Sequence, residues 1–274
     1  MTNLLDVQGV SVQFSVGNKK VDALKDVTFS IPYEGYTLGI VGESGSGKTT
    51  LGLSILNLIE PPGEILQGSV LFKGQNVLEM SDNDLRKYRW EKVAMIYQAA
   101  MNSLNPVKRI YDPMVEVLHE HRGVSKQEGL ETAKKLLSAV GIKASRQDSY
   151  PHELSGGMRQ RVVIALALIL SPELLIADEP TSALDVVVQR QIMSYLKKEV
   201  KEKHQSLIYV THEISLLPDL VENVAVFHKG RLVEMGPINK VLNEPQDPYT
   251  KKLLSNVLEI DTPIEGALAQ AMTG

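Results

Sequence analysis

The chain contains no cysteine among its 274 residues, which excludes disulfide bonds, a cysteine nucleophile, and zinc or iron–sulfur sites held by thiolates. It also lacks an excess of positive charge, because 29 Lys and Arg stand against 33 Asp and Glu, and the formal net charge is −4. A strongly basic nucleic-acid footprint is therefore absent. Hydrophobic residues make up 43% and charged residues 23%, which is ordinary for a globular protein.

Long hydrophobic runs are missing as well. The longest, Val162 to Leu170, has nine residues, whereas a transmembrane helix needs about 20. The first ten residues carry an acid and no base, unlike a signal peptide. The sequence therefore predicts a protein that is made and kept in the cytosol, although binding to an embedded partner would still bring it to a membrane.

Strand and helix patterns alternate in two parts of the chain, before residue 98 and after residue 170. Short apolar and β-branched runs predict strands at 4–7, 10–14, 27–31, 36–41, 70–72, 93–97, 174–177, 207–210 and 224–227, the first three separated by turns. Apolar periodicity predicts helices at 48–58, 110–121, 127–140, 157–170 and 186–203. This alternation indicates a parallel sheet flanked by helices, with a helical insertion over 99–170.

A glycine-rich segment after the strand at 36–41 fits the pattern G-x-x-x-x-G-K-[ST]. Glycines let successive backbone N–H groups turn toward phosphate oxygens, and the following helix points its positive end at the same place. Lys48 is expected to reach the β- and γ-phosphates and Thr49 to ligate Mg²⁺. A chance match is the alternative, expected in roughly 1% of chains of this length. The predicted nucleotide-binding residues here are Gly42, Ser44, Gly45, Ser46, Gly47, Lys48, Thr49 and Thr50.

Two carboxylates, Asp178 and Glu179, end the apolar run that begins at Leu174. In P-loop ATPases an Asp at this place holds Mg²⁺, usually through water, and an adjacent Glu can deprotonate the attacking water. By itself the pattern equally fits the start of a surface loop. With a phosphate-binding loop about 130 residues upstream, it favours a site that hydrolyses ATP.

Further motifs resemble those of the ATP-binding-cassette (ABC) ATPases. Ser155, Gly156 and Gly157, preceded by Leu154 and followed by Met158 where the family pattern has Gln, resemble the signature motif. Gln98 resembles the Q-loop, residues 182–185 resemble the D-loop, and His212 resembles the switch histidine. The resemblance covers about residues 4–235. It implies an α/β P-loop NTPase fold, with a RecA-like core, an N-terminal antiparallel β subdomain and an inserted helical subdomain.

The resemblance also implies domain bounds. They are a nucleotide-binding core with its β subdomain at 1–97 and 171–235, a helical signature subdomain at 98–170, and a C-terminal extension at 236–274. Such cassettes dimerise head to tail, with ATP between the P-loop of one subunit and the signature motif of the other. ATP and Mg²⁺ are the implied cofactors, with Thr49, Gln98 and Asp178 at the metal.

Roles for single residues follow from the same resemblance. Phe14 would stack on adenine, Gln98 would sense the metal and the water, and Asp185 would span the dimer interface. Glu179 would be the base, and His212 would contact the γ-phosphate. Each has a plainer alternative: Phe14 as core, Gln98 as an unremarkable strand end, His212 as a structural histidine, and Asp185 as the cap of the helix from residue 186.

Longer stretches are similar to the oligopeptide/dipeptide importer branch of the family. They are residues 150–162, Ser103 to Pro106, residues 176–185, and the tail segment Asp247-Pro248-Tyr249-Thr250. One of the two ATPase types of that branch commonly has Met at the position of Met158. The branch implies a second, related ATPase subunit, two transmembrane permease subunits and, indirectly, an extracytoplasmic solute-binding protein, with this chain at the cytoplasmic face of the membrane.

Other readings stay open at this point. Members of the branch also move oligosaccharides or nickel. The cysteine-bound iron–sulfur cluster of many members is excluded here. A soluble ABC ATPase acting on nucleic acid or ribosomes is the second hypothesis, although the mildly acidic charge argues against a nucleic-acid partner. A nucleotide-binding adaptor that does not hydrolyse ATP is the third, and the presence of Lys48, Asp178, Glu179 and His212 argues against it.

Overall fold

The computed structural model describes residues 2–17, 19–98, 103–182 and 184–260. Its strands are β1 (Leu5–Val16), β2 (Lys19–Ile31), β3 (Thr37–Val41), β4 (Gly63–Phe72), β5 (Gln75–Asn76), β6 (Val93–Ile96), β7 (Leu174–Asp178), β8 (Ser206–Val210), β9 (Asn223–His228) and β10 (Arg231–Pro237). Its α-helices are α1 (Lys48–Ile55), α2 (Asp82–Lys87), α3 (Asp112–Arg122), α4 (Lys126–Ala139), α5 (Gly156–Leu168), α6 (Val186–Lys203), α7 (Ile238–Asn243) and α8 (Pro248–Ile260).

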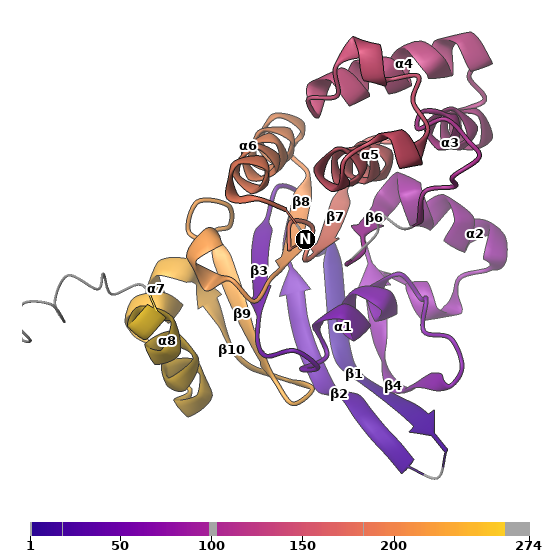
Figure 1. Ribbon diagram of the computed structural model, residues 1–274. Coiled ribbons are helices and arrows are strands. Elements are labelled where there is room, and N and C mark those ends of the chain that lie inside the picture. The colour runs from indigo at the N-terminus through magenta and orange to yellow at the C-terminus, as the bar shows by residue number, and fades with distance from the viewer. Residues whose placement is uncertain (1, 18, 99–102, 183, 261–274) are drawn as a thin grey trace, which may run out of the picture.

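The strands form two sheets (Figure 1). One is antiparallel and has the order β2-β1-β4-β5. The other has the order β10-β9-β3-β8-β7-β6, in which β9 to β6 are parallel and β10 runs antiparallel to β9. Because parallel strands share a direction, the carboxyl ends of β3, β7 and β8 meet at one edge of the sheet.

Both faces of the larger sheet are buried, as the uninterrupted apolar runs of its strands require. Along β7, Leu174 and Ile176 enter the core shared with α1 and the antiparallel sheet, whereas Leu175 and Ala177 enter the core shared with α5 and α6. This alternation follows from the two-residue period of a strand. Helix α1 therefore lies between the two sheets and contacts both β4 and β7.

The N-terminal strands differ from the sequence expectation. Separate strands at 4–7 and 10–14 are wrong, because β1 runs unbroken from Leu5 to Val16. Gly9 adopts φ 60°, and the register with β2 shifts between Val7 and Val10. The glycine thus makes a bulge within one strand and not a turn between two. Strand β10 was not expected either, and it crosses the expected domain boundary at residue 235.

Helix α6 has the bounds that its periodicity predicts, Val186 to Lys203. Helix α5 begins at Gly156, one residue before the expected start, because the Ser155 hydroxyl accepts the Met158 N–H and caps it. Helices α3, α4 and α5 lie together at the upper right of Figure 1 and share one core with α6.

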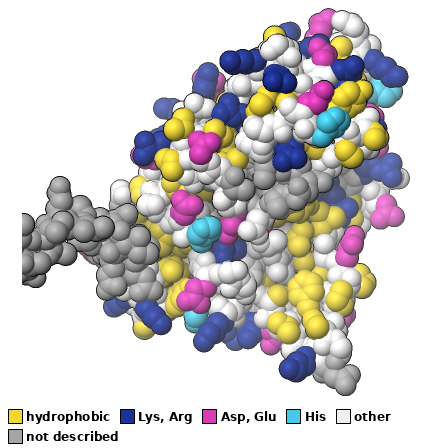
Figure 2. Space-filling model, viewed as in Figure 1, with side chains coloured by type: hydrophobic (Ala, Val, Ile, Leu, Met, Phe, Trp, Pro, Cys, Tyr) yellow, Lys and Arg dark blue, Asp and Glu magenta, His cyan; other side chains and the backbone are white. Residues whose placement is uncertain are grey.

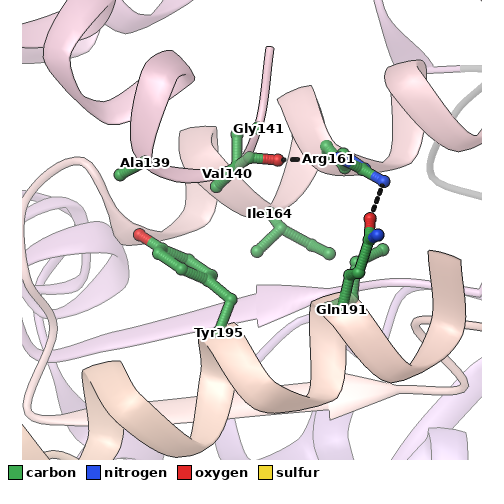
Figure 3. Close-up of a pocket in the computed structure, with 8 residues that line it drawn as sticks. Ala139, Val140, Gly141, Arg161, Ile164, Gln191 and Tyr195 are labelled. Carbon is green, nitrogen blue, oxygen red and sulfur yellow. Dashed lines mark hydrogen bonds between the residues drawn. The ribbon is translucent and has the colours of Figure 1, made fainter. Parts of the chain in front are cut away.

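Arg161 on α5 ties this helical region to α6. Its guanidinium donates to the Val140 carbonyl at 3.4 Å and to Gln191 Oε1 at 2.6 Å (Figure 3). A cavity of about 140 Å³ lies beside these bonds, with Ile164 and Tyr195 in its lining. Arg161 therefore links the end of α4 to α6 through hydrogen bonds, next to the apolar contacts between these helices.

A pair of ion pairs joins the two sheets at the amino end of β7, opposite to the edge where the carboxyl ends of β3, β7 and β8 meet. Glu173, which precedes β7, lies 2.5 Å from Lys73 Nζ and 2.7 Å from Lys92 Nζ. Burial alone would raise the pKa of Glu173, but the hydrogen bonds from Lys73 and Lys92 outweigh it and hold that pKa below its ordinary value.

Helices α7 and α8 follow β10 and lie beyond this outer strand of the larger sheet, at the left of Figure 1. Over the described ranges, none of the helices combines the length and apolarity that crossing a membrane requires.

Candidate active site

The glycine-rich loop joins the end of β3 to the start of α1, as the sequence predicts. Gly45 and Gly47 have φ values of 75° and 104°, which L residues with side chains rarely adopt. Space is also limiting at Gly42 and Gly47, where a Cβ would lie 2.2 Å from the Phe227 carbonyl oxygen and 2.4 Å from the Ala23 carbonyl oxygen, respectively. The loop therefore needs glycine for both conformation and close backbone approach.

The Lys48 side chain folds back along the loop that precedes it. Its ammonium group donates to the carbonyl oxygens of Gly42 and Glu43, each at 2.8 Å, and contacts Ser46 Oγ at 3.4 Å. The residue is 7% exposed. Burial lowers the pKa of Lys48, while the nearby carboxylates of the site act in the opposite direction.

Thr49 and Asp178 meet, although 129 residues separate them. The Thr49 hydroxyl donates to Asp178 Oδ2 at 2.6 Å. Asp178 ends β7 and is 2% exposed, so burial raises the pKa of its carboxyl group; the Thr49 hydrogen bond opposes this shift. A hydroxyl and a carboxylate oxygen thus converge beside the loop.

Glu179 is the centre of a second group. Its Oε2 accepts a hydrogen bond from Gln98 Nε2 at 2.9 Å, and its Oε1 lies 3.1 Å from His212 Nδ1. Its own N–H donates to the Val210 carbonyl at 2.9 Å, so β7 and β8 stay paired up to this residue. The adjacent parallel strands thereby bring Glu179 and His212 together. Glu179 has φ 46°, a strained conformation for a residue with a side chain.

Most of these residues line one cavity of about 150 Å³, but the predicted site residues Gly42, Ser46 and His212 are not among its lining residues. It is lined by Ala23, Ser44, Gly45, Gly47, Lys48, Thr49, Thr50, Gln98, Asp178 and Glu179. Backbone N–H groups, one cation and two carboxylates in this arrangement suit a polyphosphate and an associated metal ion. Among the side chains that Figure 2 colours by type, acidic and basic ones are interspersed on the face that it shows.

Other predicted site residues do not line this cavity in the described chain. Ser155, Gly156 and Gly157 lie at the start of α5. Asp185 caps α6 by accepting the Val188 N–H at 2.9 Å, as its plainer alternative requires. Phe14 lies in β1 opposite Gly63 of β4, and its ring closely approaches that glycine. The D-loop residue Ala183 lies outside the described residues.

Sequence reasoning missed two features of the site. Ala23 lines the cavity from β2, and nothing in its residue type indicates this. Gln160, 4% exposed, donates from its side chain to the Pro180 carbonyl at 2.6 Å. This bond ties α5 to the residue that follows Glu179. Gln160 stands between Arg159 and Arg161, ahead of the apolar run from Val162, so its place in the sequence does not indicate that it is buried.

A parallel sheet with a phosphate-binding loop between β3 and α1, and an acidic pair at the end of β7, defines the P-loop NTPase class. Comparison with known proteins narrows this class. The family model described as "ABC transporter" matches residues 24–182, and the one described as "Oligopeptide/dipeptide transporter, C-terminal region" matches residues 233–273. The chain belongs to the ABC transporter family.

Curated relatives match along almost the whole chain. The oligopeptide transport ATP-binding protein OppD of Bacillus subtilis (strain 168) is 40% identical over 98% of this chain and 75% of its own length. OppD of Escherichia coli (strain K12) is 42% identical over 97% of this chain and 79% of its own length. The dipeptide transport ATP-binding protein DppD of Bacillus subtilis is 39% identical over 97% and 82%.

Comparison with solved structures also finds an ATP-binding cassette. The ATP-binding cassette MJ0796, in a dimeric post-hydrolysis state bound to ADP and Pi, superposes with a TM-score of 0.76 at 30% identity. The match covers 85% of this chain and 98% of that one.

Proposed function

We propose that the chain is the ATP-hydrolysing subunit of an importer for oligopeptides or dipeptides. The observation that carries the ATPase is the convergence of Lys48, Asp178, Glu179 and His212 at one edge of the sheet. The importer assignment is supported by relatives named as oligopeptide and dipeptide transport ATP-binding proteins, and by the match of the tail to that branch. That match favours import over action on nucleic acid or ribosomes.

In the proposed reaction, the loop N–H groups and the α1 N-terminus bind the ATP phosphates, and Lys48 neutralises charge on the β- and γ-phosphates. Glu179 accepts the proton of the attacking water. His212 Nδ1 lies 3.1 Å from Glu179 Oε1 and orients that carboxylate, and its exposed ring would contact the γ-phosphate. Gln98 donates to the other carboxylate oxygen, and its amide oxygen would contact the attacking water or the metal.

Magnesium is the metal that these residues would hold. The Thr49 hydroxyl and the Asp178 carboxylate are hard oxygen donors 2.6 Å apart, and Mg²⁺ prefers oxygen ligands and retains several waters. Gln98 offers a further amide oxygen. When bound, Mg²⁺ neutralises charge that develops on the phosphates.

The signature motif acts in the partner subunit under this proposal. Ser155, Gly156 and Gly157 combine a hydroxyl and backbone N–H groups at a helix start, which is an anion site without charge of its own. These residues do not line the chain's own cavity, and in a head-to-tail dimer they would instead face the nucleotide bound by the partner subunit. Asp185 would then lie at the dimer interface, and Phe14 would stack on the adenine. A second, related ATPase subunit is the proposed partner.

The remaining assembly is proposed from the same relationship. Two permease subunits would bind the helical region, taken as residues 98–170, and the core at 1–97 and 171–235 would hydrolyse ATP. An extracytoplasmic solute-binding protein would deliver the peptide. The chain itself would be peripheral, at the cytoplasmic face of the membrane, with no nucleic-acid partner.

The variant Glu179→Gln tests the proposal. Purified protein carrying it should bind MgATP with the affinity of the wild type, while hydrolysis falls by about 10²- to 10⁴-fold because the general base is lost. A matched control is Glu34→Gln, which neutralises an exposed carboxylate paired with Lys73 at the other end of the sheet.

Phosphate release measured with and without added DNA or RNA completes the test. Undiminished turnover in Glu179→Gln would remove Glu179 as the base. Turnover that nucleic acid stimulates strongly would contradict the importer. ATP-driven peptide uptake by proteoliposomes holding the chain with its permeases would support it.

A further inference from the structure

The C-terminal extension reaches the phosphate-binding loop. Tyr249, at the start of α8, accepts a hydrogen bond on its hydroxyl oxygen from the Glu43 N–H at 3.2 Å. The two residues are 206 positions apart. Tyr249 belongs to the tail segment Asp247 to Thr250, for which neither the motifs nor the proposed reaction supplies a role.

The start of α8 is held firmly in place. Asp247 Oδ1 accepts the N–H groups of Tyr249 and Thr250 at 2.7 and 3.3 Å. Glu234 of β10 in turn accepts the N–H groups of Gln246 and Asp247 at 2.8 and 3.1 Å. The tail is therefore fixed to the edge strand of the sheet that carries the site.

The Tyr249 ring is also fixed. It stacks on the ring of His228, the last residue of β9, with centroids 3.8 Å apart and planes 30° from each other. The hairpin after β9 itself touches the loop, because the Gly230 N–H donates to the Ser46 carbonyl at 3.0 Å. The stack on His228 and the hydrogen bonds at the start of α8 thus fix the Tyr249 side chain with its hydroxyl at the phosphate-binding loop.

The bond to Glu43 matters because of the peptide group it holds. That group joins Gly42 to Glu43: its carbonyl oxygen accepts the Lys48 ammonium at 2.8 Å, and its N–H donates to Tyr249. Gly42 has φ 153°, which residues with side chains rarely adopt, and the Lys48 and Tyr249 hydrogen bonds hold this peptide from its two sides. One peptide plane therefore lies between the catalytic lysine and the tail.

We propose that Tyr249 is a positioning residue: its hydroxyl fixes the Gly42–Glu43 peptide, and through it the ammonium of Lys48, so that the C-terminal extension sets the nucleotide affinity of the site. The inference rests on the proposed function, because it assumes that the loop binds ATP. A structural role alone would stabilise α8 and leave nucleotide affinity unchanged.

The test uses the full chain and three readouts. In Tyr249→Phe the ring keeps its stack on His228 and only the hydroxyl is lost. The dissociation constant for MgATP should rise by about two- to tenfold, the range that one neutral hydrogen bond supplies. The KM of hydrolysis should rise with it, while kcat changes little. Amide hydrogen exchange at Glu43 should become faster, which reports the bond directly.

Two further variants separate the explanations. Gln246→Ala removes a tail side chain that donates to the Glu244 carbonyl at 2.7 Å, and should leave affinity and exchange as in the wild type. Tyr249→Ala should impair affinity at least as much as Tyr249→Phe. If Tyr249→Phe matches the wild type in affinity and in Glu43 exchange, the inference is wrong, even when Tyr249→Ala is impaired. A wild-type chain that binds no ATP would instead overturn the proposed function.

Discussion

Replacing Gly47 or Gly45 by alanine compares two glycines of one loop. Both have left-handed φ values, 104° and 75°, so each alanine bears a similar backbone cost of about 1–2 kcal/mol. The two positions differ in the space that is available for a Cβ atom. A Cβ at Gly45 meets no atom within 4 Å, whereas at Gly47 it lies 2.4 Å from the Ala23 carbonyl oxygen and 2.9 Å from a Leu24 methyl carbon.

Gly47→Ala must therefore displace β2 or the loop, and overpacking of this kind adds about 1–3 kcal/mol. We expect Gly47→Ala to lower the free energy of unfolding by about 2–5 kcal/mol and Gly45→Ala by about 1–2 kcal/mol. Because Ala23 lines the cavity, the displacement at Gly47 should also weaken nucleotide binding.

Urea unfolding without nucleotide measures the difference, since a ligand that binds only the folded state would mask it. The midpoint for Gly47→Ala should lie about 0.5–1 M below that for Gly45→Ala. Equal midpoints, or a lower one for Gly45→Ala, would refute the reasoning from close backbone approach.

Three further outcomes are expected. Lys48→Ala should weaken nucleotide binding in a titration, and unchanged affinity would contradict the phosphate-binding loop. Gln160→Ala should lower the free energy of unfolding by about 1–3 kcal/mol, because the Pro180 carbonyl loses its buried donor; an unchanged urea midpoint would count against that bond. The pKa of Glu173 is lowered because hydrogen bonds from its two lysine partners outweigh burial, so its contribution to stability is present above its unfolded value near 4.5 and is lost as the pH falls through the folded value. Glu173→Gln should therefore flatten the fall in unfolding free energy below about pH 5, and a profile as steep as that of the wild type would contradict this.

Local signals in the sequence predicted much of the fold. Helix α6 has a regular apolar period and a capping Asp185, so its bounds are predictable from those residues alone. The glycine pattern predicts the loop before α1, and the apolar runs predict β7 and β8. Because parallel strands end at one edge, the meeting of Glu179 and His212 follows from the topology.

What could not be predicted depends on tertiary contact. Gly9 can make a turn or a bulge, and only the pairing of β1 with β2 decides between them. Strand β10 has a weak pattern of its own and is stabilised by β9. The contacts of Gln160 with Pro180 and of Tyr249 with Glu43 join segments far apart in sequence, and neither partner carries a local signal of the other.

The left-handed backbone conformation of Glu179 affects how strongly selection for folding stability favours glutamate at this position. A glycine would adopt φ 46° without strain. This gain would offset two costs of the substitution, namely the lost side-chain hydrogen bonds and the greater conformational freedom of glycine in the unfolded chain. Folding therefore exerts little selection for the glutamate. Under the proposed function, a chain that has lost this side chain would still fold and pair with its partner subunit, and it would compete with active chains as an inactive one.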